Sequence, residues 1–133
     1  MSRDTLFFHQ TLANRLIIEV RDLSRRYFGD YHKVVLEVSC RLPLEAALFA
    51  GEVDPTQALA AAQAVFGEEA RSIVRLERMG VAGDTLEAVR GALWDSFTTT
   101  TLAYMQRPDY PVRMLRRLQA QRHQAGRHLR ALC

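Results

Sequence analysis

The feature that most constrains this fold is a change in the hydrophobic period after Pro43. Before it, apolar side chains alternate with polar ones, whereas after Gly51 they recur at intervals of three and four residues. Alternation is typical of half-buried strands, and the longer period is typical of amphipathic helices. The sequence therefore predicts an α+β fold, with a small antiparallel N-terminal sheet of three or four strands packed against two or three helices.

Two β-branched segments, 15–22 and 31–40, carry this alternation. Valine and isoleucine favour pleated, half-buried surfaces, so each segment predicts a strand. The residues between them, 23–30, are polar apart from their aromatics and include the turn signal Gly29-Asp30. We therefore expect an antiparallel hairpin with a long loop.

Two further segments extend this sheet. Residues 5–11 predict a strand that turns at Ala13-Asn14 and completes a three-stranded meander. Residues 70–79 fit the period of a strand and also that of a helix. We take them as a fourth strand, because it would pair with the meander and give the helix after Asp54 a surface to cover.

The first helix has a recognisable start and stop. Asp54 is placed to cap it, Pro55 occupies the first helical position, and Gln57 stands at the third. We expect this helix to end near Phe66, because Gly67 is a natural C-terminal stop. Its apolar stripe consists of Leu59, Ala62, Val65 and Phe66.

The second helix begins at Asp84, with Glu87 at the third helical position, and ends before Pro108. The side that should lie on the sheet carries residues at intervals of three and four, namely Leu86, Val89, Leu93, Phe97, Thr101 and Tyr104.

The third helix, residues 112–131, combines an apolar seam with a basic face. The seam consists of Leu115, Leu118, Arg122, Ala125, Leu129 and Leu132, and the basic face of Arg113, Arg116, Arg117, Arg127 and Arg130. Arg122 and Ala125 weaken the seam, and Gly126 in the interior lowers helix stability. This pattern favours a docked or dimer-forming helix over an autonomous coiled coil.

Composition and length place the chain among ordinary globular proteins. Its 133 residues fit a single α+β domain over 1–133, and no apolar run is long enough to cross a membrane. The N-terminus lacks the apolar core of a secretory signal, so we expect a cytoplasmic protein. Cys40 and Cys133 are too few for a disulfide framework; Cys40 is expected to be a small core residue and Cys133 a chain end without a role.

The segment 21–32 concentrates the most chemistry. Arginine side chains there suit a phosphate or carboxylate, and the aromatic rings suit a base or a protein partner. The plainer interpretation, which we favour, is a solvated hairpin loop with surface ion pairs. The candidate residues are Arg21, Ser24, Arg25, Arg26, Tyr27, Asp30 and His32.

No motif predicts an enzyme, a metal or a cofactor. His123 and His128 are five residues apart and so point in different directions on a helix, and His9 and His32 have no flanking ligand motif. The chain contains no glycine-rich nucleotide loop, nucleophile elbow or calcium loop.

The run Leu12–Arg25, followed by Gly29-Asp30, resembles the N-terminal pattern of a set of small bacterial proteins without an assigned function. That pattern favours glycine after the asparagine, where this chain has Arg15. The resemblance implies no catalytic or binding residues.

Three functions stay open. The leading one is a non-enzymatic protein-interaction domain that forms a homo-oligomer through the last helix or a sheet edge. The second is nucleic-acid binding, since residues 107–133 contain seven arginines and one acid. The third is a small-ligand or enzymatic site at 21–32.

Overall fold

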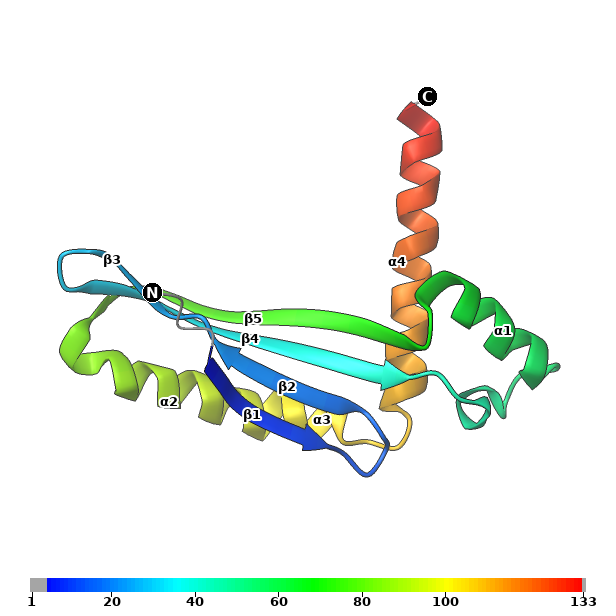
Figure 1. The fold of residues 1–133 in the computed structure, drawn as a ribbon, viewed down its shortest axis with the longest axis horizontal. Coiled ribbons are helices and arrows are strands. Elements are labelled where there is room, and N and C mark those ends of the chain that lie inside the picture. The colour runs from blue at the N-terminus through cyan, green and yellow to red at the C-terminus, as the bar shows by residue number, and fades with distance from the viewer. Residues whose placement is uncertain (1–4, 133) are drawn as a thin grey trace.

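The structure, a computed structural model, describes the backbone of residues 5–132 and the side chains of residues 5–125. It is an α+β fold with an antiparallel sheet of five strands, one more than the upper prediction (Figure 1). The strands are β1 Thr5–Thr11, β2 Ile17–Asp22, β3 Arg25–Phe28, β4 Tyr31–Pro43 and β5 Glu69–Ala82. The α-helices are α1 Pro55–Phe66, α2 Leu86–Phe97, α3 Ala103–Met105 and α4 Tyr110–Leu132.

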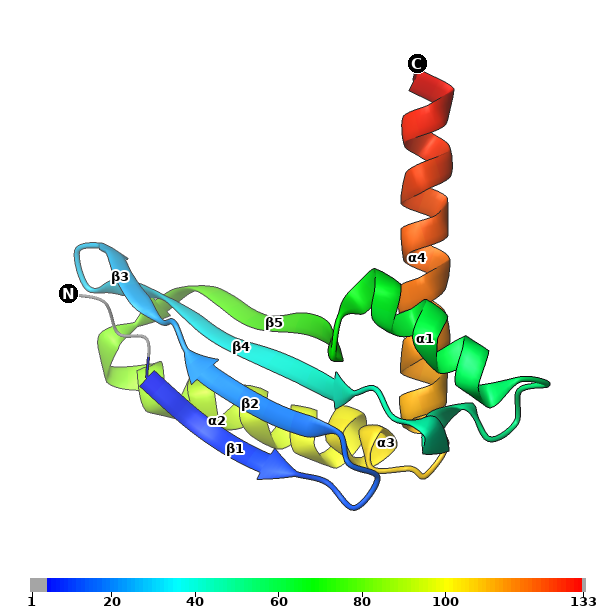
Figure 2. The ribbon, with the colours of Figure 1, turned by 45° about the vertical axis from the view of Figure 1, so that its right-hand side comes forward.

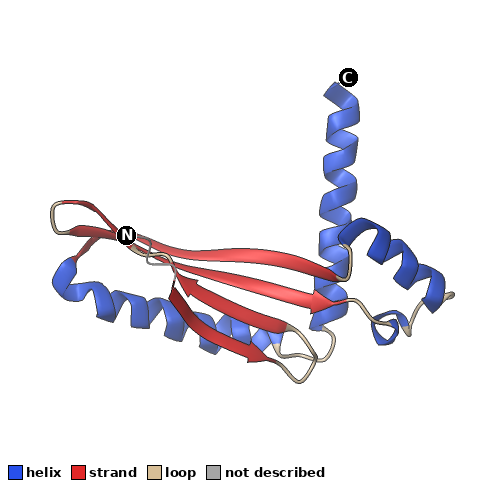
Figure 3. Ribbon diagram, viewed as in Figure 1, coloured by secondary structure: helices blue, strands red, loops and turns tan. Residues whose placement is uncertain are grey.

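The long strand β4 organises the sheet (Figure 3). On one side it pairs with β2 and then with β3, and on the other it pairs with β5 along its whole length. The segment 70–79, which fits both periods, is therefore a strand, as we predicted, and β5 extends beyond it at both ends.

One face of the sheet is buried because its side chains alternate. The buried face carries Ile18, Val20, Val34, Leu36, Val38, Cys40 and Leu42. Helix α2 lies under this face (Figures 1 and 2). The ring of its Trp94 packs against Phe7 and Phe8 of β1. The opposite face, which we call the open face, carries mainly polar and charged residues.

The predicted hairpin loop at 23–30 is wrong in part, because residues 25–28 form β3. Strand β2 ends at Asp22, and the backbone N–H of Leu23 donates to the carbonyl oxygen of Val35. The chain then continues alongside β4, with Arg26 opposite His32. Gly29 adopts a φ of 55°, so the turn between β3 and β4 is short.

Helix α1 has the predicted cap but does not cover the sheet. The carboxylate of Asp54 accepts a hydrogen bond of 3.2 Å from the backbone N–H of Gln57, and Gly67 follows the helix at a φ of 82°. The helix lies beyond the end of the sheet, next to α4 (Figure 2). In its predicted stripe Ala62 is buried but Val65 is 45% exposed, because α2 already occupies the sheet face.

The predicted start of the second helix is wrong. Asp84 belongs to a 3₁₀ turn, Gly83–Thr85, and α2 begins at Leu86. None of the described side chains caps α2; the hydroxyl of Thr85 donates to the carbonyl oxygen of Ala82 instead. The carboxylate of Asp30 accepts from the backbone N–H of Gly83 at 3.2 Å, which fastens this turn to the β3–β4 hairpin.

A π-helical turn, Thr98–Leu102, overturns the last part of the predicted stripe. It adds one residue to the turn, so the inward-facing positions after Phe97 are Leu102 and Met105. The predicted positions Thr101 and Tyr104 are exposed. Threonine hydroxyls bond to carbonyl oxygens of the preceding turn, including Thr100 to Ser96 at 2.6 Å.

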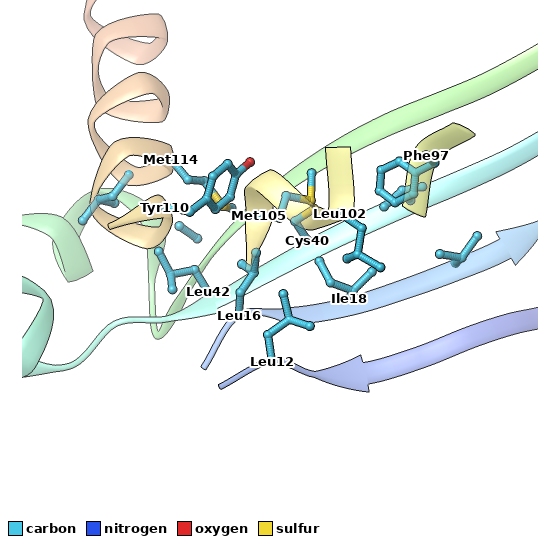
Figure 4. Close-up of a cluster of buried hydrophobic side chains, with 14 of the residues drawn as sticks. Leu12, Leu16, Ile18, Cys40, Leu42, Phe97, Leu102, Met105, Tyr110 and Met114 are labelled. Atoms are coloured by element: carbon cyan, nitrogen blue, oxygen red, sulfur yellow. Dashed lines mark hydrogen bonds between the residues drawn. The ribbon is translucent and has the colours of Figure 1, made fainter. Parts of the chain in front are cut away.

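The first part of α4 completes the core (Figure 4). Tyr110, Met114 and Leu115 are buried and belong to the same cluster as Leu42 and Met105, with Tyr110 and Met114 beside these two residues in Figure 4. Helix α4 then passes the start of β5 and extends beyond the open face, on the side away from α2 (Figures 1 and 2). We call residues 119–132 the projecting half of α4.

Candidate interaction surfaces

Ser24 and Asp30 of the predicted 21–32 site form hydrogen bonds with the backbone of neighbouring elements. Ser24 is buried, its hydroxyl oxygen accepts a hydrogen bond of 3.1 Å from the backbone N–H of Val35, and its own N–H donates to Asp22. The carboxylate of Asp30 accepts from the N–H of Gly83. Both side chains hold the β2–β3 and β3–β4 connections in place.

The other candidates do not converge on one cavity. Arg25, Arg26 and Tyr27 are exposed on β3, where consecutive side chains point to opposite faces. Arg21 belongs to β2, and the Nε2 atom of His32 lies 3.9 Å from a carboxylate oxygen of Asp30. These candidate residues of 21–32, which are close together in the sequence, are therefore spread over three strands.

The predicted seam of the last helix divides into two parts. Leu115 is buried in the core and Leu118 is half-buried, so the first part docks on the body. Ala125 is exposed, as is every residue from 119 to 125. The side chain of Leu129 lies outside the described residues. Docking alone therefore accounts for only the first part of the seam.

The predicted basic face is also divided. Arg113 forms an ion pair with Asp109 at 2.9 Å, and Arg117 reaches the hydroxyl of Ser72 on β5 at 3.4 Å. Arg116 is exposed. The side chains of Arg127 and Arg130 lie outside the described residues. Two of the three arginines whose side chains are described are thus held by contacts within the chain.

A cleft of about 620 Å³ separates α4 from α1 and the start of β5. Phe66 and Val65 line it from α1, and Leu118 and Ala125 line it from α4. The guanidinium carbon of Arg122 lies 5.9 Å from the ring centroid of Phe66. This cation–π contact explains how a charged residue occupies a position in the seam.

Strand β5 has an open edge. Among the described residues it pairs with β4 on one side, and α4 covers the other side near Ser72 through Arg117. From Ile73 to Met79 the edge carries large apolar side chains that face solvent: Ile73 is 59% exposed and Met79 is 61% exposed. We call the unpaired side of residues 73–79 the β5 edge.

An apolar cleft of about 330 Å³ lies beside the β5 edge, between β5 and α2. Its lining includes Leu76 and Met79 from the strand, and Val89, Leu93 and Phe97 from the helix. The strand edge and this cleft form one continuous surface. Sequence reasoning missed it because it depends on where α2 crosses the sheet.

The open face is crossed by ion pairs between neighbouring strands. Arg41 on β4 bridges Glu19 on β2 and Glu69 on β5, and Arg75 on β5 reaches Glu37 on β4 at 3.0 Å. Hydrogen bonds from Arg41 hold the pKa of Glu69 below its ordinary value, despite partial burial that acts in the opposite direction. The sequence spacing of these charged residues does not predict the ion pairs, because the pairs depend on strand register.

A third cleft, of about 300 Å³, lies under the β1–β2 turn. Asn14, Arg15 and Glu45 provide polar groups at its lining. The side-chain amide of Asn14 donates hydrogen bonds to two backbone carbonyl oxygens, and Arg15 forms an ion pair with Glu45. These polar groups are therefore engaged with the protein itself.

The chemistry of catalytic and metal sites is not assembled in the described part of the chain. No group of three or more His, Cys, Asp or Glu side chains lies close enough there to hold a metal ion. Cys40 is buried, as predicted, and burial raises the pKa of its thiol to about 11, which disfavours the nucleophilic thiolate. None of the helices described combines the length and the apolar character needed to cross a bilayer.

Comparison with known proteins gives no identification. Neither protein-family models, nor curated proteins, nor solved structures contain a match to this chain.

Proposed function

We propose that this chain is a non-enzymatic protein-interaction domain that forms a homo-oligomer. The observation that carries the proposal is that two regular elements are left exposed. Ile73 and Met79 on the β5 edge are 59% and 61% exposed, and all described side chains of the projecting half of α4, residues 119–125, are exposed. Isolated helical segments of about 12 residues are only marginally stable in water. A helical segment that does not pack on the core of its own chain becomes more stable when another chain packs against it.

The chemistry of the described residues also supports a contact function. The one described cysteine is buried and its thiol pKa is raised, and the buried serine accepts a backbone hydrogen bond. The two exposed elements, the projecting half of α4 and the β5 edge, are long and regular. Proteins commonly bind one another through an exposed helix face or through the unpaired backbone groups of a strand edge.

Nucleic-acid binding is less well supported. The net charge of residues 107–133 favours it, but Arg113 and Arg117 are engaged with Asp109 and with Ser72 on the body of the protein. Fluorescence polarisation with a labelled DNA duplex and a labelled RNA tests this alternative. Affinity that falls steeply with salt, and that is lost in Arg116→Glu, would favour it.

Sedimentation equilibrium over a concentration series tests the proposal. We expect the full chain to exceed the mass of a monomer at micromolar concentrations and to dissociate on dilution. A strict monomer at high micromolar concentration would overturn the proposal. A truncated chain that ends at Ala120 retains the buried Tyr110, Met114 and Leu115, so it tests whether the projecting half is needed for association.

A further inference from the structure

We propose that the dimer contact is the β5 edge, paired antiparallel with the β5 edge of a second copy about a two-fold axis at Leu76. This inference rests on the proposed self-association and names its surface. The joined structure would be one continuous sheet, in which the unpaired backbone groups of residues 73–79 find partners.

Charge selects the register. A two-fold axis perpendicular to the sheet keeps the open faces of both copies on the same side, so it passes midway between a residue of β5 and the same residue of the copy. An axis at Ile73 places Arg71 opposite Arg75 of the copy, and axes at Arg75 or Glu77 place each charge opposite itself. These registers juxtapose like charges, which destabilises a strand pair.

An axis at Leu76 instead places Arg75 of each copy opposite Glu77 of the other. Within one copy, Arg75 already reaches Glu37, and Glu77 lies 3.8 Å from Lys33. The joined sheet would therefore carry a row of alternating charge, from Glu37 through Arg75 to the copy's Glu77 and Lys33. The two-fold symmetry repeats this row once.

Three of the four large apolar side chains of the edge face apolar partners in the same register, and the fourth, Val74, lies opposite Arg78. Leu76 meets its own counterpart at the axis, and Ile73 lies opposite Met79, so the two most exposed apolar side chains of the edge cover each other. The cleft between β5 and α2 lies on the side away from the open face, and the copy brings its own cleft against it. Exposed apolar surface of this kind marks an interaction site.

The fold limits this strand pairing at both ends of residues 73–79. Helix α4 covers strand β5 at Ser72 through Arg117, immediately before the β5 edge begins at Ile73. At the other end, Met79 and Gly80 together oppose the single residue Lys33, and Gly80 has a φ of 67°. Such a bulge bends a strand, so the regular edge stops at Met79.

Two other axes within residues 73–79 avoid like-charge pairs. One, at Met79, would pair residues 80 and 81, which lie beyond the regular edge. The other, at Val74, pairs Arg71 with Glu77, but Arg71 is next to Ser72, where α4 lies against the strand. The Leu76 axis uses only residues 73–79, the β5 edge. It also separates the two α4 helices by roughly 25 Å along the strands, so they do not contribute to this contact.

Charge exchange tests the pairing. Arg75→Glu and Glu77→Arg should each raise the dimer dissociation constant about tenfold or more, because each creates two repulsive pairs across the interface. The double variant should restore dimerisation, although its contacts with Glu37 and Lys33 within each copy stay repulsive. Rescue therefore cannot come from better folding. Arg25→Glu, an equal charge change on exposed β3, is the matched control and should leave the dimer unchanged.

Cysteine cross-linking tests the register in a Cys133→Ser background. Leu76→Cys should give a disulfide-linked dimer on mild oxidation, because residues facing each other across an antiparallel pair have suitable Cα separations. Val74→Cys should not cross-link. If Val74→Cys cross-links and Leu76→Cys does not, the axis is at Val74 and the inference is wrong. A dimer that resists both charge variants but dissociates when the chain ends at Ala120 would overturn the inference and leave the proposed function standing.

Discussion

The amide nitrogen of Asn14 lies 2.7 Å from the carbonyl oxygen of Met105, to which it donates a hydrogen bond across 91 residues of chain. The same amide donates to the carbonyl oxygen of Arg107 at 2.9 Å, while its own oxygen accepts from the N–H of Leu16. One side chain thus ties the β1–β2 turn to the connection between α3 and α4. This connection sets the direction of α4.

Replacing Asn14 tests this link. Asn14→Ala should lower the free energy of unfolding by about 2–3 kcal/mol, because it leaves two carbonyl oxygens and one N–H without their partner. Urea denaturation monitored by circular dichroism measures the change. Gln124→Ala truncates an exposed amide on α4 and should change stability by less than about 0.5 kcal/mol. Equal effects of the two substitutions would contradict the role of Asn14.

The backbone of Arg15 gives a second prediction. Arg15 has a φ of 74°, in the left-handed region that glycine adopts more readily than any other residue. Arg15→Gly should therefore be more stable than Arg15→Ala by about 1 kcal/mol, since both substitutions lose the ion pair with Glu45 and only glycine relieves the backbone. Thermal unfolding of the two variants compares them directly. The reverse order would show that the conformation at this position is not strained.

The π-helical turn predicts an asymmetric response to deletions. Removing Thr99 would return Thr98–Leu102 to an α-helical turn and keep Leu102 and Met105 facing the core, so stability should change by no more than about 1 kcal/mol. Removing Ala92 should cost several times as much, because it rotates Leu93 and Phe97 away from the sheet. Chemical denaturation of both deletion variants measures the difference. Equal losses would argue against a turn with one extra residue.

Burial of Cys40 predicts a loss of stability in alkaline solution. The thiol pKa is raised from an ordinary value of 9.0 to about 11 in the folded chain, so the thiol is protonated in both states below pH 9 and its contribution is then complete. As the pH rises toward 11 the unfolded chain releases this proton more readily, and the free energy of unfolding should fall by about 2–3 kcal/mol.

The control for this prediction is Cys40→Ala, compared with the unsubstituted residue in a Cys133→Ser background. Alanine should remove most of the pH dependence between pH 9 and pH 11. Burial also raises the pKa of Tyr110, which acts in the same direction, so Tyr110→Phe identifies any residual slope. A slope that is unchanged in Cys40→Ala would contradict the assignment to this thiol.

The sequence by itself determined the strands 5–11 and 31–40, the cap of α1 by Asp54, and the burial of Cys40. These features depend on local side-chain alternation and on capping groups within three residues of each other, so period and spacing reveal them. The third helix was also identified, beginning two residues later than α4 does. Its buried and exposed parts were not separated, because the seam continues past the point where the body ends.

Only the tertiary structure decided which surfaces are left open. The alternation in β5 looks the same whether its edge is paired or free, and α1 carries an apolar stripe although α2 occupies the sheet face. The π turn shifted Thr101 and Tyr104 outward through hydrogen bonds that no helical period anticipates. The β5 edge and the projecting half of α4 are exposed because other elements pack on the core in their place. Which elements do so is a property of the whole chain.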